Sequence, residues 1–580
     1  MDKSSYGEGA ARQATSGRTR RIVATIGLFV GANALLSTYR WITAGAPLLA
    51  LIPLPETIVF AWVAYGVARL RRGAAASRRT AWLAARGAAG AALGLMIGFS
   101  VAETLFQYVY ARPFAPRLDI PMTRGGLLLL FGEIGPIVDV LTPITVALIF
   151  AALFVAGVLL VRAAEAIAMP PIRLRSAIGA TVLLAIVSVG FGLPDSLTAI
   201  TVLSWQEDGR AEFAAHDDVV AGGAARAAGE LAADDGLEPD RARYAFPGLR
   251  DRDLYVFMVE AYGVVAYTRD EINRQLAPSL RRLEAALTDN GHGVVSSALE
   301  APVAGGFSWL AEATLLTGQW VQTQQSFEQL YGAGLPTLTG LLHNGGYYTF
   351  TIRPGTVHGE WPEGWDLYRF EESMLAYGRR IGYRGPIFSY VATPDQYSIW
   401  RAHQRIGELR APGGKAHDRP LLVYYQLVSS HTPFNRIPPV IDDWELLGGG
   451  EVYTERADQI LTFNNTWTGG TQMDEGYVAS LRYVFDVIAK YIEELLDHES
   501  EPIIVILGDH QPQRPIREPD ATRSVPVHVA SRDEAVLDAF RSIGYTDGLH
   551  GDAPGPHERM SEFFPAFTRI ARGVIDSRGR

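Results

Sequence analysis

Five apolar segments in the first 200 residues constrain this chain most, because each is long enough to serve as a membrane span. A helix that crosses a bilayer takes roughly 20 residues. The segments predict a transmembrane domain of five helices, followed by a separate soluble part. They comprise residues 22–37, 47–68, 88–108, 137–160 and 177–197.

Arginine residues flank these segments unevenly. They cluster in residues 1–21, after the second segment and after the fourth, whereas the other connections carry fewer. Because basic residues concentrate on the cytoplasmic side, the N-terminus is predicted to be cytoplasmic. An odd number of spans then places everything after about residue 198 outside the inner membrane of a bacterium. The four later segments argue against a cleaved signal peptide.

The length of 580 residues also predicts more than one domain. We expect a transmembrane domain over residues 22–198, a linker over 199–250 and an extracytoplasmic domain over 251–575. Residues 125–136 are apolar but short, and an interfacial or re-entrant piece fits them better than a span. The linker is rich in Ala, Asp and Glu and has no clear apolar stripe.

Overall charge and composition exclude some classes of function. A net charge of -10 and a pI near 5.7 argue against nucleic acid as the main partner, because phosphate backbones bind basic surfaces. The chain has no cysteine. Disulfides, thiol catalysis and cysteine zinc sites are therefore excluded.

The extracytoplasmic part alternates strand-like and helical runs, which predicts an α/β domain with a largely parallel central sheet. One helix, over residues 473–496, carries apolar residues at spacings of three and four, and this stripe indicates core packing. The other predicted helices comprise residues 270–289 and 335–343. Predicted strands comprise residues 254–259, 347–352, 421–427, 503–507 and 525–529.

Three separated segments carry the residues that suggest chemistry. Glu260 ends one strand-like run, and Asp509 and His510 follow another. Ser308 follows two glycines and opens a predicted helix over residues 309–317. Because α/β enzymes gather such residues at the carboxyl ends of their strands, the three segments are predicted to converge. Carboxylate and imidazole ligands suit Mn²⁺, Zn²⁺ or related divalent ions.

Each of these residues also has a plainer interpretation. A glutamate at a strand end is often structural or solvated, and Asp509-His510 would also fit a turn. Serine is a preferred N-cap residue, so Ser308 would simply cap its helix. An N-cap hydroxyl also faces the positive end of the helix dipole, where an anion is favoured, so the two interpretations of Ser308 are compatible.

The order of these motifs resembles the alkaline phosphatase and sulfatase superfamily. Ser308 stands ten residues before the glycine of Leu316-Thr317-Gly318, a spacing that the superfamily uses around its nucleophile. Ser430-His431-Thr432-Pro433-Phe434 is similar to its His-x-Pro-aromatic motif, and Gly508-Asp509-His510 to its late metal pair. Segments 346–349, 353–359 and 364–368 resemble further family elements. The resemblance covers about residues 253–530.

Five spans followed by such a domain look most like the lipoteichoic acid synthase group of phosphoglycerol transferases. The single Glu260, where classical sulfatases have paired aspartates, favours the same group. The resemblance implies one metal, commonly Mn²⁺, with Zn²⁺, Mg²⁺ or Ca²⁺ as alternatives. Its ligands would be Glu260, Ser308, Asp509 and His510. His431 would contact the substrate phosphate, with Arg353, His358 or Trp361 nearby.

A working sulfatase is not expected. The resemblance implies that sulfatases convert a cysteine or serine to formylglycine and need Pro or Ala two positions later and Arg four positions later. Those positions hold Leu310 and Glu312 here. Ser308 should therefore remain a serine, which a bound divalent ion would activate for attack on phosphorus.

These observations predict a membrane-anchored, metal-dependent phosphotransferase. Ser308 would take a phosphoglycerol-type group from an anionic phospholipid, and a hydroxyl of a glycan or polymer would then accept it. Two alternatives stay open. Water as the acceptor would make the protein a phosphodiesterase or phosphatase, and loss of catalysis would leave a sensor or scaffold. The sequence does not disclose the donor head group, the acceptor or the oligomeric state.

Overall fold

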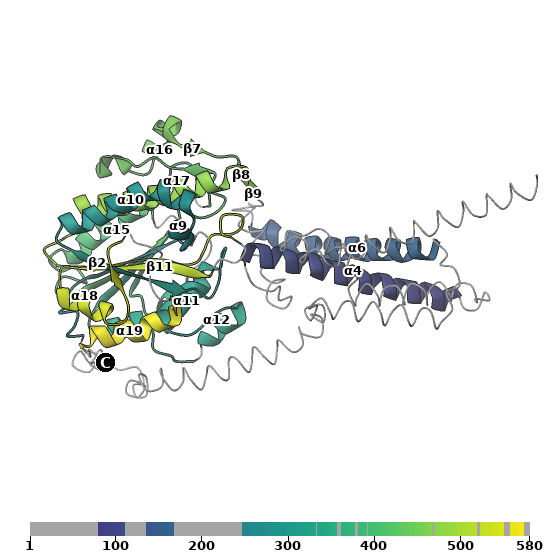
Figure 1. Cartoon of the computed structure of the whole chain (residues 1–580), viewed down its shortest axis with the longest axis horizontal. Coiled ribbons are helices and arrows are strands. Elements are labelled where there is room, and N and C mark those ends of the chain that lie inside the picture. Colours follow the sequence, from purple (N-terminus) through teal and green to yellow (C-terminus); the bar gives the residue numbers. More distant parts are fainter. Residues whose placement is uncertain are drawn as a thin grey trace, which may run out of the picture. The chain divides into compact units, whose positions relative to one another are not determined.

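The computed structural model has two compact units, Met1–Ala215 and His216–Arg580 (Figure 1). Predicted segments 22–37, 47–68 and 177–197 lie outside the described residues, as do nearly all of segment 125–136 and most of the linker. The described residues are 79–110, 135–166, 246–331, 333–356, 361–376, 381–390, 393–466, 469–518, 522–549 and 557–573.

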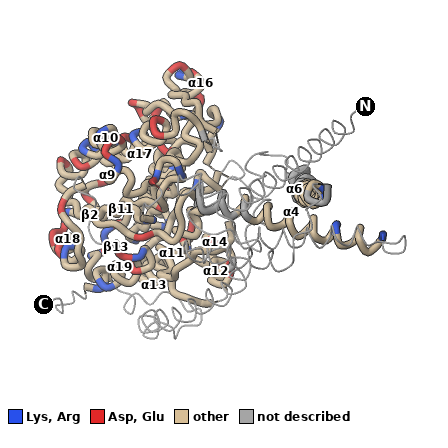
Figure 2. The backbone as a smooth tube through the Cα atoms, turned by 45° about the vertical axis from the view of Figure 1, so that its right-hand side comes forward, with Lys and Arg blue, Asp and Glu red and all other residues tan. Residues whose placement is uncertain are grey.

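Two long helices make up the described part of the first unit. The third predicted span lies within α4 (Arg79–Tyr110) and the fourth within α6 (Gly135–Ala166). Both are almost free of charge along their described length (Figure 2). Among described residues, one stretch, Arg79–Phe99, is long and apolar enough to cross a membrane, and Ala147–Ala163 is a shorter apolar stretch. The described residues thus do not show the predicted five-helix domain.

Glycines let α4 and α6 approach closely. Gly90, Gly94 and Gly98 recur every four residues on α4. A Cβ atom on Gly94 would lie 2.2 Å from the backbone oxygen of Leu153, and one on Gly157 would lie 1.9 Å from that of Gly90. Small residues at this spacing are typical of helix pairs that pack within a lipid bilayer.

The second unit is built on a nine-stranded sheet with the order β12-β2-β11-β10-β1-β5-β3-β4, in which β13 also pairs with β2. Strands β10, β1, β5, β3 and β4 are parallel, and β11 is antiparallel to both of its neighbours. The predicted, largely parallel sheet is confirmed. The strands are β1 (Leu254–Val259), β2 (Gly293–Glu300), β3 (Tyr348–Arg353), β4 (Glu372–Leu375), β5 (Leu421–Leu427), β10 (Ile503–Gly508), β11 (Ser524–Ser531), β12 (Thr546–Asp547) and β13 (His557–Arg559).

Helices cover both faces of the sheet (Figure 1). Alternate strand residues face two separate buried cores: Phe257 packs in one, and Met258 in the other. On the first face lie α9 (Val265–Thr268), α10 (Asp270–Asp289), α15 (Asp395–Arg410) and α17 (Met473–Glu494). On the second lie α11 (Ser308–Thr317), α12 (Gln324–Leu330), α13 (Leu338–Asn344), α18 (Glu534–Arg541) and α19 (Phe563–Ala571).

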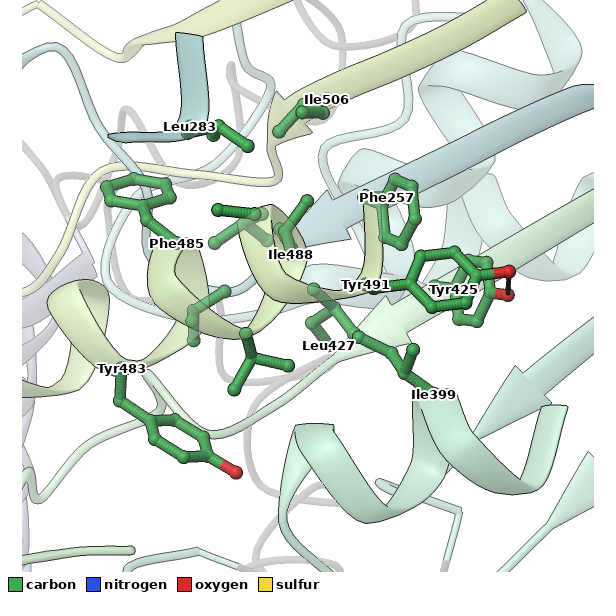
Figure 3. Close-up of a cluster of buried hydrophobic side chains, with 14 of the residues drawn as sticks. Phe257, Leu283, Ile399, Tyr425, Leu427, Tyr483, Phe485, Ile488, Tyr491 and Ile506 are labelled. Carbon is green, nitrogen blue, oxygen red and sulfur yellow. Dashed lines mark hydrogen bonds between the residues drawn. The ribbon is translucent and has the colours of Figure 1, made fainter. Parts of the chain in front are cut away.

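The apolar stripe of α17 is buried, as predicted. Ile488 and Tyr491 pack against Phe257 and Tyr425 of the central strands (Figure 3). The hydroxyls of Tyr425 and Tyr491 lie 3.4 Å apart. The remaining elements are short: α14 (Glu363–Asp366), α16 (Val452–Glu455), η5 (Trp444–Leu447), η6 (Ala457–Gln459), η7 (Met560–Glu562), β6 (Arg436–Ile437), β7 (Leu461–Thr462), β8 (Asn465–Thr466) and β9 (Gly469–Gly470).

Candidate metal centre and nucleophile

Two neighbouring parallel strands deliver the acidic residues of the site. Strands β1 and β10 pair in register, with Val259 opposite Gly508 at their carboxyl ends. Glu260 and Asp509 are the next residues of the two strands, so they leave the sheet at the same edge. Both are buried, and so is His510. Two of the three segments that were predicted to converge therefore meet at this edge of the sheet.

Ser308 reaches the same edge through a tight turn. Ala304 pairs with Gln511, and the Gly305 N–H donates to the Gln511 carbonyl at 2.7 Å, which ties this turn to the strand end that carries His510. Gly305 and Gly306 have φ angles of 72° and 143°, which glycine adopts without strain. The turn aims the chain into α11.

The N-cap of α11 is Phe307, with a φ of 67°, and it has no side-chain cap hydrogen bond. Ser308 is the first residue of the helix rather than its cap, so the N-cap interpretation of Ser308 is wrong. Its hydroxyl is consequently not used by the helix end, and it points to the acidic residues instead.

The four predicted ligands form one cluster. The Ser308 hydroxyl donates to Glu260 Oε2 at 3.0 Å and lies 3.3 Å from His510 Nε2. His510 Nε2 lies 3.3 Å from Glu260 Oε1 and 3.5 Å from Asp509 Oδ2. Ligand atoms of the two acids and the histidine all lie within 4.8 Å of one another.

Backbone contacts orient these side chains. The N–H groups of Ala261 and His510 both donate to Asp509 Oδ1, at 2.8 and 2.6 Å. His510 Nδ1 bonds to the Gln511 carbonyl at 2.9 Å. That bond turns Nε2 toward the carboxylates, which is the arrangement that metal-ligating histidines use. The donor set therefore fits a divalent cation such as Mn²⁺ or Zn²⁺.

The charges in the cluster compensate one another only in part. Burial and the nearby Glu260 carboxylate raise the pKa of Asp509 to about 7. Burial lowers the pKa of His510, but the two carboxylates outweigh it and raise the value to about 9. Two buried acids that face each other repel, and a cation between them relieves this repulsion.

His431 lies beside this cluster, close enough to act on the pKa of Glu260, and its contact with a substrate phosphate stays a prediction. The loop that carries it is held at both sides: the Asp395 carboxylate accepts from the N–H groups of Val428 and Ser429, at 2.8 and 3.0 Å. The Ser430 hydroxyl donates to the Glu260 carbonyl at 2.6 Å.

The imidazole of His431 stacks on the Tyr390 ring with 3.7 Å between centroids, and its Nδ1 bonds to the Thr432 carbonyl at 2.7 Å. Burial lowers the pKa of His431, although the Glu260 carboxylate acts in the opposite direction. The imidazole thus faces the acidic cluster from the neighbouring strand end. Neither Asp395 nor Tyr390 was predicted from the sequence; an acid right after Thr-Pro at a helix start is the one signal for Asp395.

Arg353 has a different partner from the predicted substrate. Its Nη1 and Nη2 donate to the two carboxylate oxygens of Glu312 at 2.5 and 2.7 Å, and both residues are buried. Trp361 stacks on this guanidinium, with Arg353 Cζ 3.8 Å from the ring centroid. This ion pair therefore links α11 to β3. A contact with substrate stays a prediction for Arg353 and Trp361, and His358 lies outside the described residues.

Comparisons with known proteins come from structure alone, because no family model and no curated protein matches this chain. The lipoteichoic acid synthase LtaP from Listeria monocytogenes is similar at 16% identity with a TM-score of 0.32, over 49% of this chain and 66% of that one.

Two further structures are similar. The C-terminal periplasmic domain of EptC from Escherichia coli has 13% identity and a TM-score of 0.34, over 57% of this chain and 81% of that one. The phosphoglycerol transferase GacH from Streptococcus pyogenes, in complex with sn-glycerol-1-phosphate, has 13% identity and a TM-score of 0.31, over 51% and 77%. Structures of the predicted group are thus among those that this chain resembles. At these values the similarity says nothing about its reaction.

Proposed function

We propose that this protein is a membrane-anchored, metal-dependent phosphotransferase that moves a phosphoglycerol-type group from an anionic phospholipid to a hydroxyl of a glycan or polymer. One observation carries the proposal. A serine hydroxyl at the first residue of a helix lies 3.0 Å from one buried carboxylate and 3.3 Å from a buried imidazole, beside a second carboxylate of the same cluster.

Glu260, Asp509, His510 and Ser308 would hold the cation, which when bound lowers the pKa of the coordinated hydroxyl and offsets charge on phosphoryl oxygens. Ser308 Oγ attacks phosphorus, and the bond from phosphorus to the diacylglycerol oxygen breaks. Ser308 loses its hydroxyl proton and the leaving oxygen takes one up, which releases diacylglycerol and leaves glycerol phosphate bound to Ser308 as a phosphodiester. An acceptor hydroxyl then attacks the ester, and Ser308 is restored.

Two fixed features of the protein assist this displacement. The N-terminus of α11 places backbone dipoles next to Ser308, where they favour an anionic phosphoryl group. His431 is held beside the cluster by its stacking on Tyr390 and by the anchored loop. Its Nδ1 donates to the Thr432 carbonyl, so its Nε2 would donate a hydrogen bond to a phosphoryl oxygen when the imidazole is protonated, and this bond would stabilise the charge that develops there.

The residue four positions after Ser308 supports a serine nucleophile over formylglycine. Glu312 stands there and is bound by Arg353 on both of its carboxylate oxygens. The arginine that the resemblance implies for sulfatase maturation has no counterpart at this position.

The apolar helices support membrane anchoring. Large apolar side chains on α6 are exposed, among them Leu148 at 65%, Leu159 at 55% and Phe154 at 46%. Such exposure suits contact with lipid better than contact with water. We propose that the N-terminus is cytoplasmic and that the α/β domain works outside the cytoplasmic membrane. Anchoring would raise the effective concentration of a lipid donor at the site.

The test uses the purified full chain with vesicles that contain labelled phosphatidylglycerol, with and without Mn²⁺. We expect Mn²⁺-dependent release of diacylglycerol, and mass spectrometry should find a glycerophosphoryl group on the peptide that contains Ser308. Ser308→Ala should lower release on the order of 10⁴-fold. Ser542→Ala, at the end of α18, is the matched control and should keep full activity.

Unchanged release by Ser308→Ala would remove this serine from the mechanism. The acceptor is read from the fate of the label when glycan is present. Label attached to the glycan supports a transferase, whereas label in free glycerol phosphate would make water the acceptor.

A further inference from the structure

The segment that follows β1 contains an uncommon backbone conformation. Ala261, the residue after the candidate ligand Glu260, has a φ of 55°. Residues with a Cβ atom enter this left-handed region only at a cost in free energy. Such conformations persist where the surrounding contacts hold them, and they concentrate at functional sites. The contacts around Ala261 therefore show what keeps this turn in place.

On one side, the turn serves the candidate metal centre. The Ala261 N–H donates to Asp509 Oδ1 at 2.8 Å, so the left-handed residue binds a second candidate ligand directly. The Tyr262 carbonyl lies against the end of β10, where a Cβ atom on Gly508 would be 1.9 Å from its oxygen. Opening this turn would release the Asp509 carboxylate and change the direction in which Glu260 points.

On the other side, Tyr477 of α17 holds the turn. Its hydroxyl donates to the Ala261 carbonyl at 2.9 Å, and both residues are buried. Burial and the Asp509 carboxylate raise the pKa of Tyr477, although a hydrogen bond with Gly263 acts in the opposite direction. The phenol therefore keeps its proton and stays a donor. Tyr477 belongs to the stripe of α17 that the sequence predicts for core packing, and packing alone does not require this hydroxyl.

The same side chain also contacts the loop that carries His431. The Tyr477 ring packs edge-on against Phe434, with 5.5 Å between centroids. A Cβ atom on the preceding Gly476 would lie 2.2 Å from the Phe434 backbone oxygen. The hydroxyl of Tyr477 thus serves the Glu260 side of the centre and its ring the His431 side, so a substitution can separate the two contacts.

We propose that Tyr477 is a positioning residue of the candidate metal centre, and that its hydroxyl holds Ala261 in the left-handed conformation that orients Glu260 and Asp509. The proposal rests on the proposed function, since it concerns the cation of that reaction. Removing a group that orients a metal ligand typically weakens metal binding about 10- to 100-fold. Because Tyr477 acts through a backbone turn rather than on a ligand side chain, we expect the lower end of this range.

The experiment measures Mn²⁺ binding by calorimetry on the metal-free full chain in detergent, so it does not depend on turnover. Tyr477→Phe removes the hydroxyl and keeps the ring against Phe434. Its Mn²⁺ dissociation constant should rise about tenfold. Tyr491→Phe, on the same helix, is the matched control. It removes a buried hydroxyl that lies 3.4 Å from that of Tyr425 (Figure 3), and it should keep the Mn²⁺ affinity of the wild type.

A second substitution separates positioning from packing. Ala261→Gly should bind Mn²⁺ within about threefold of the wild type, because glycine adopts a positive φ without strain and no longer needs the hydroxyl. When Tyr477→Phe is added to Ala261→Gly, the dissociation constant should therefore rise by less than about threefold. If Tyr477 acted through packing alone, the same tenfold loss would occur with either residue at position 261. The double variant decides this even where Tyr477→Phe alone does not fold.

Hydrogen exchange gives a readout that needs neither metal nor activity. In chelator, the Ala261 amide should exchange about tenfold faster in Tyr477→Phe than in the wild type, because the turn opens locally. The amides of α13, on the other face of the sheet, should exchange at the wild-type rate. Unchanged exchange at Ala261 would show that the hydroxyl does not hold this turn.

The proposal is also overturned if Tyr477→Phe binds Mn²⁺ as tightly as the wild type, or if its loss of affinity is the same in the Ala261→Gly background. Failure of the proposed function looks different: diacylglycerol release from phosphatidylglycerol would be absent while the effect of Tyr477→Phe on Mn²⁺ affinity persists. Mn²⁺-dependent release together with an unchanged Mn²⁺ affinity in Tyr477→Phe would refute the role of Tyr477 alone.

Discussion

Buried carboxylates stand at both ends of strand β1, and the two ends give them different partners. Asp253 precedes β1, where both of its oxygens accept hydrogen bonds from Arg410 and one also accepts from the Leu421 N–H. Glu260 follows β1 and Asp509 follows β10. Around these two acids the described residues place a histidine and a serine hydroxyl, and no arginine or lysine pairs with either.

The difference separates a structural end of the sheet from a binding end. At the amino end, a guanidinium offsets the cost of burying Asp253, although burial still raises the pKa of this acid. Removing one partner of such a buried ion pair strongly destabilises the folded protein. At the carboxyl end, His510 offsets only part of the negative charge of Glu260 and Asp509. A divalent cation would therefore be the best partner for these two acids.

The largest expected effect comes from neutralising the binding end. Asp509→Asn keeps an acceptor for the N–H groups of Ala261 and His510 but removes a charge from the cluster. Phosphotransfer should fall on the order of 10³-fold or more. In chelator, the free energy of unfolding should stay equal or increase, because the repulsion with Glu260 is relieved. A variant that loses stability in chelator as well as activity would contradict this contrast.

Neutralising the acid at the structural end should lower stability and leave activity unchanged. Asp253→Asn breaks the pair with Arg410, whose side chain is 33% exposed. The free energy of unfolding in urea should decrease by roughly 2–4 kcal/mol, because a buried pair loses one partner and solvent screens part of the loss. Activity per folded molecule should not change. A marked loss of activity at full folding would mean that the two ends are coupled.

A bound cation should stabilise only proteins with an intact binding end. At a free Mn²⁺ concentration of a hundredfold Kd, stability should rise by about 2.7 kcal/mol. Thermal unfolding should detect this rise in the wild type and in Asp253→Asn, but not in Asp509→Asn. An equal rise in all three proteins would place the Mn²⁺ site elsewhere.

Much of this arrangement could be predicted because the central strands are continuous apolar runs. Strands β1 and β5 begin and end where predicted, and the acids that follow β1 and β10 are the first polar residues after those runs. Strand β2 was not predicted, because Ser296 and Ser297 interrupt its apolar pattern although both are buried. Its edge partners are too short to show a pattern.

Residues that hold others in place were harder to predict, since their role depends on contacts far along the chain. Asp395 binds the loop of His431 from 33 residues upstream. Arg353 was predicted at the substrate because the segment resembles a family motif, yet its geometry gives it Glu312 as a partner. A motif identifies a residue type and its position, whereas a bidentate ion pair depends on which helix packs across the strand.

The smallest expected effect concerns a histidine pair near the structural end of the sheet. His292 is buried, and its Nε2 lies 3.3 Å from Nδ1 of His498, whose Nε2 bonds to the Ile492 carbonyl at 2.7 Å. Burial, then His498 and Arg532, lower the pKa of His292 to about 4, although Glu501 acts in the opposite direction. A second proton on His292 would add a positive charge near that of Arg532. It would also sit on Nδ1, which has no hydrogen-bond acceptor among the described residues.

The unfolded chain therefore binds a proton between pH 6.5 and 4 that the folded protein does not, and stability should decrease as pH falls through this window. Above pH 6.5 this contribution is fully present. His292→Gln keeps a donor for His498 but does not titrate, so its urea midpoint should depend less on pH than that of the wild type. His417→Gln, at an exposed histidine, should retain the wild-type dependence. Parallel pH curves for the wild type and His292→Gln would show that the buried pair is not the source of this acid sensitivity.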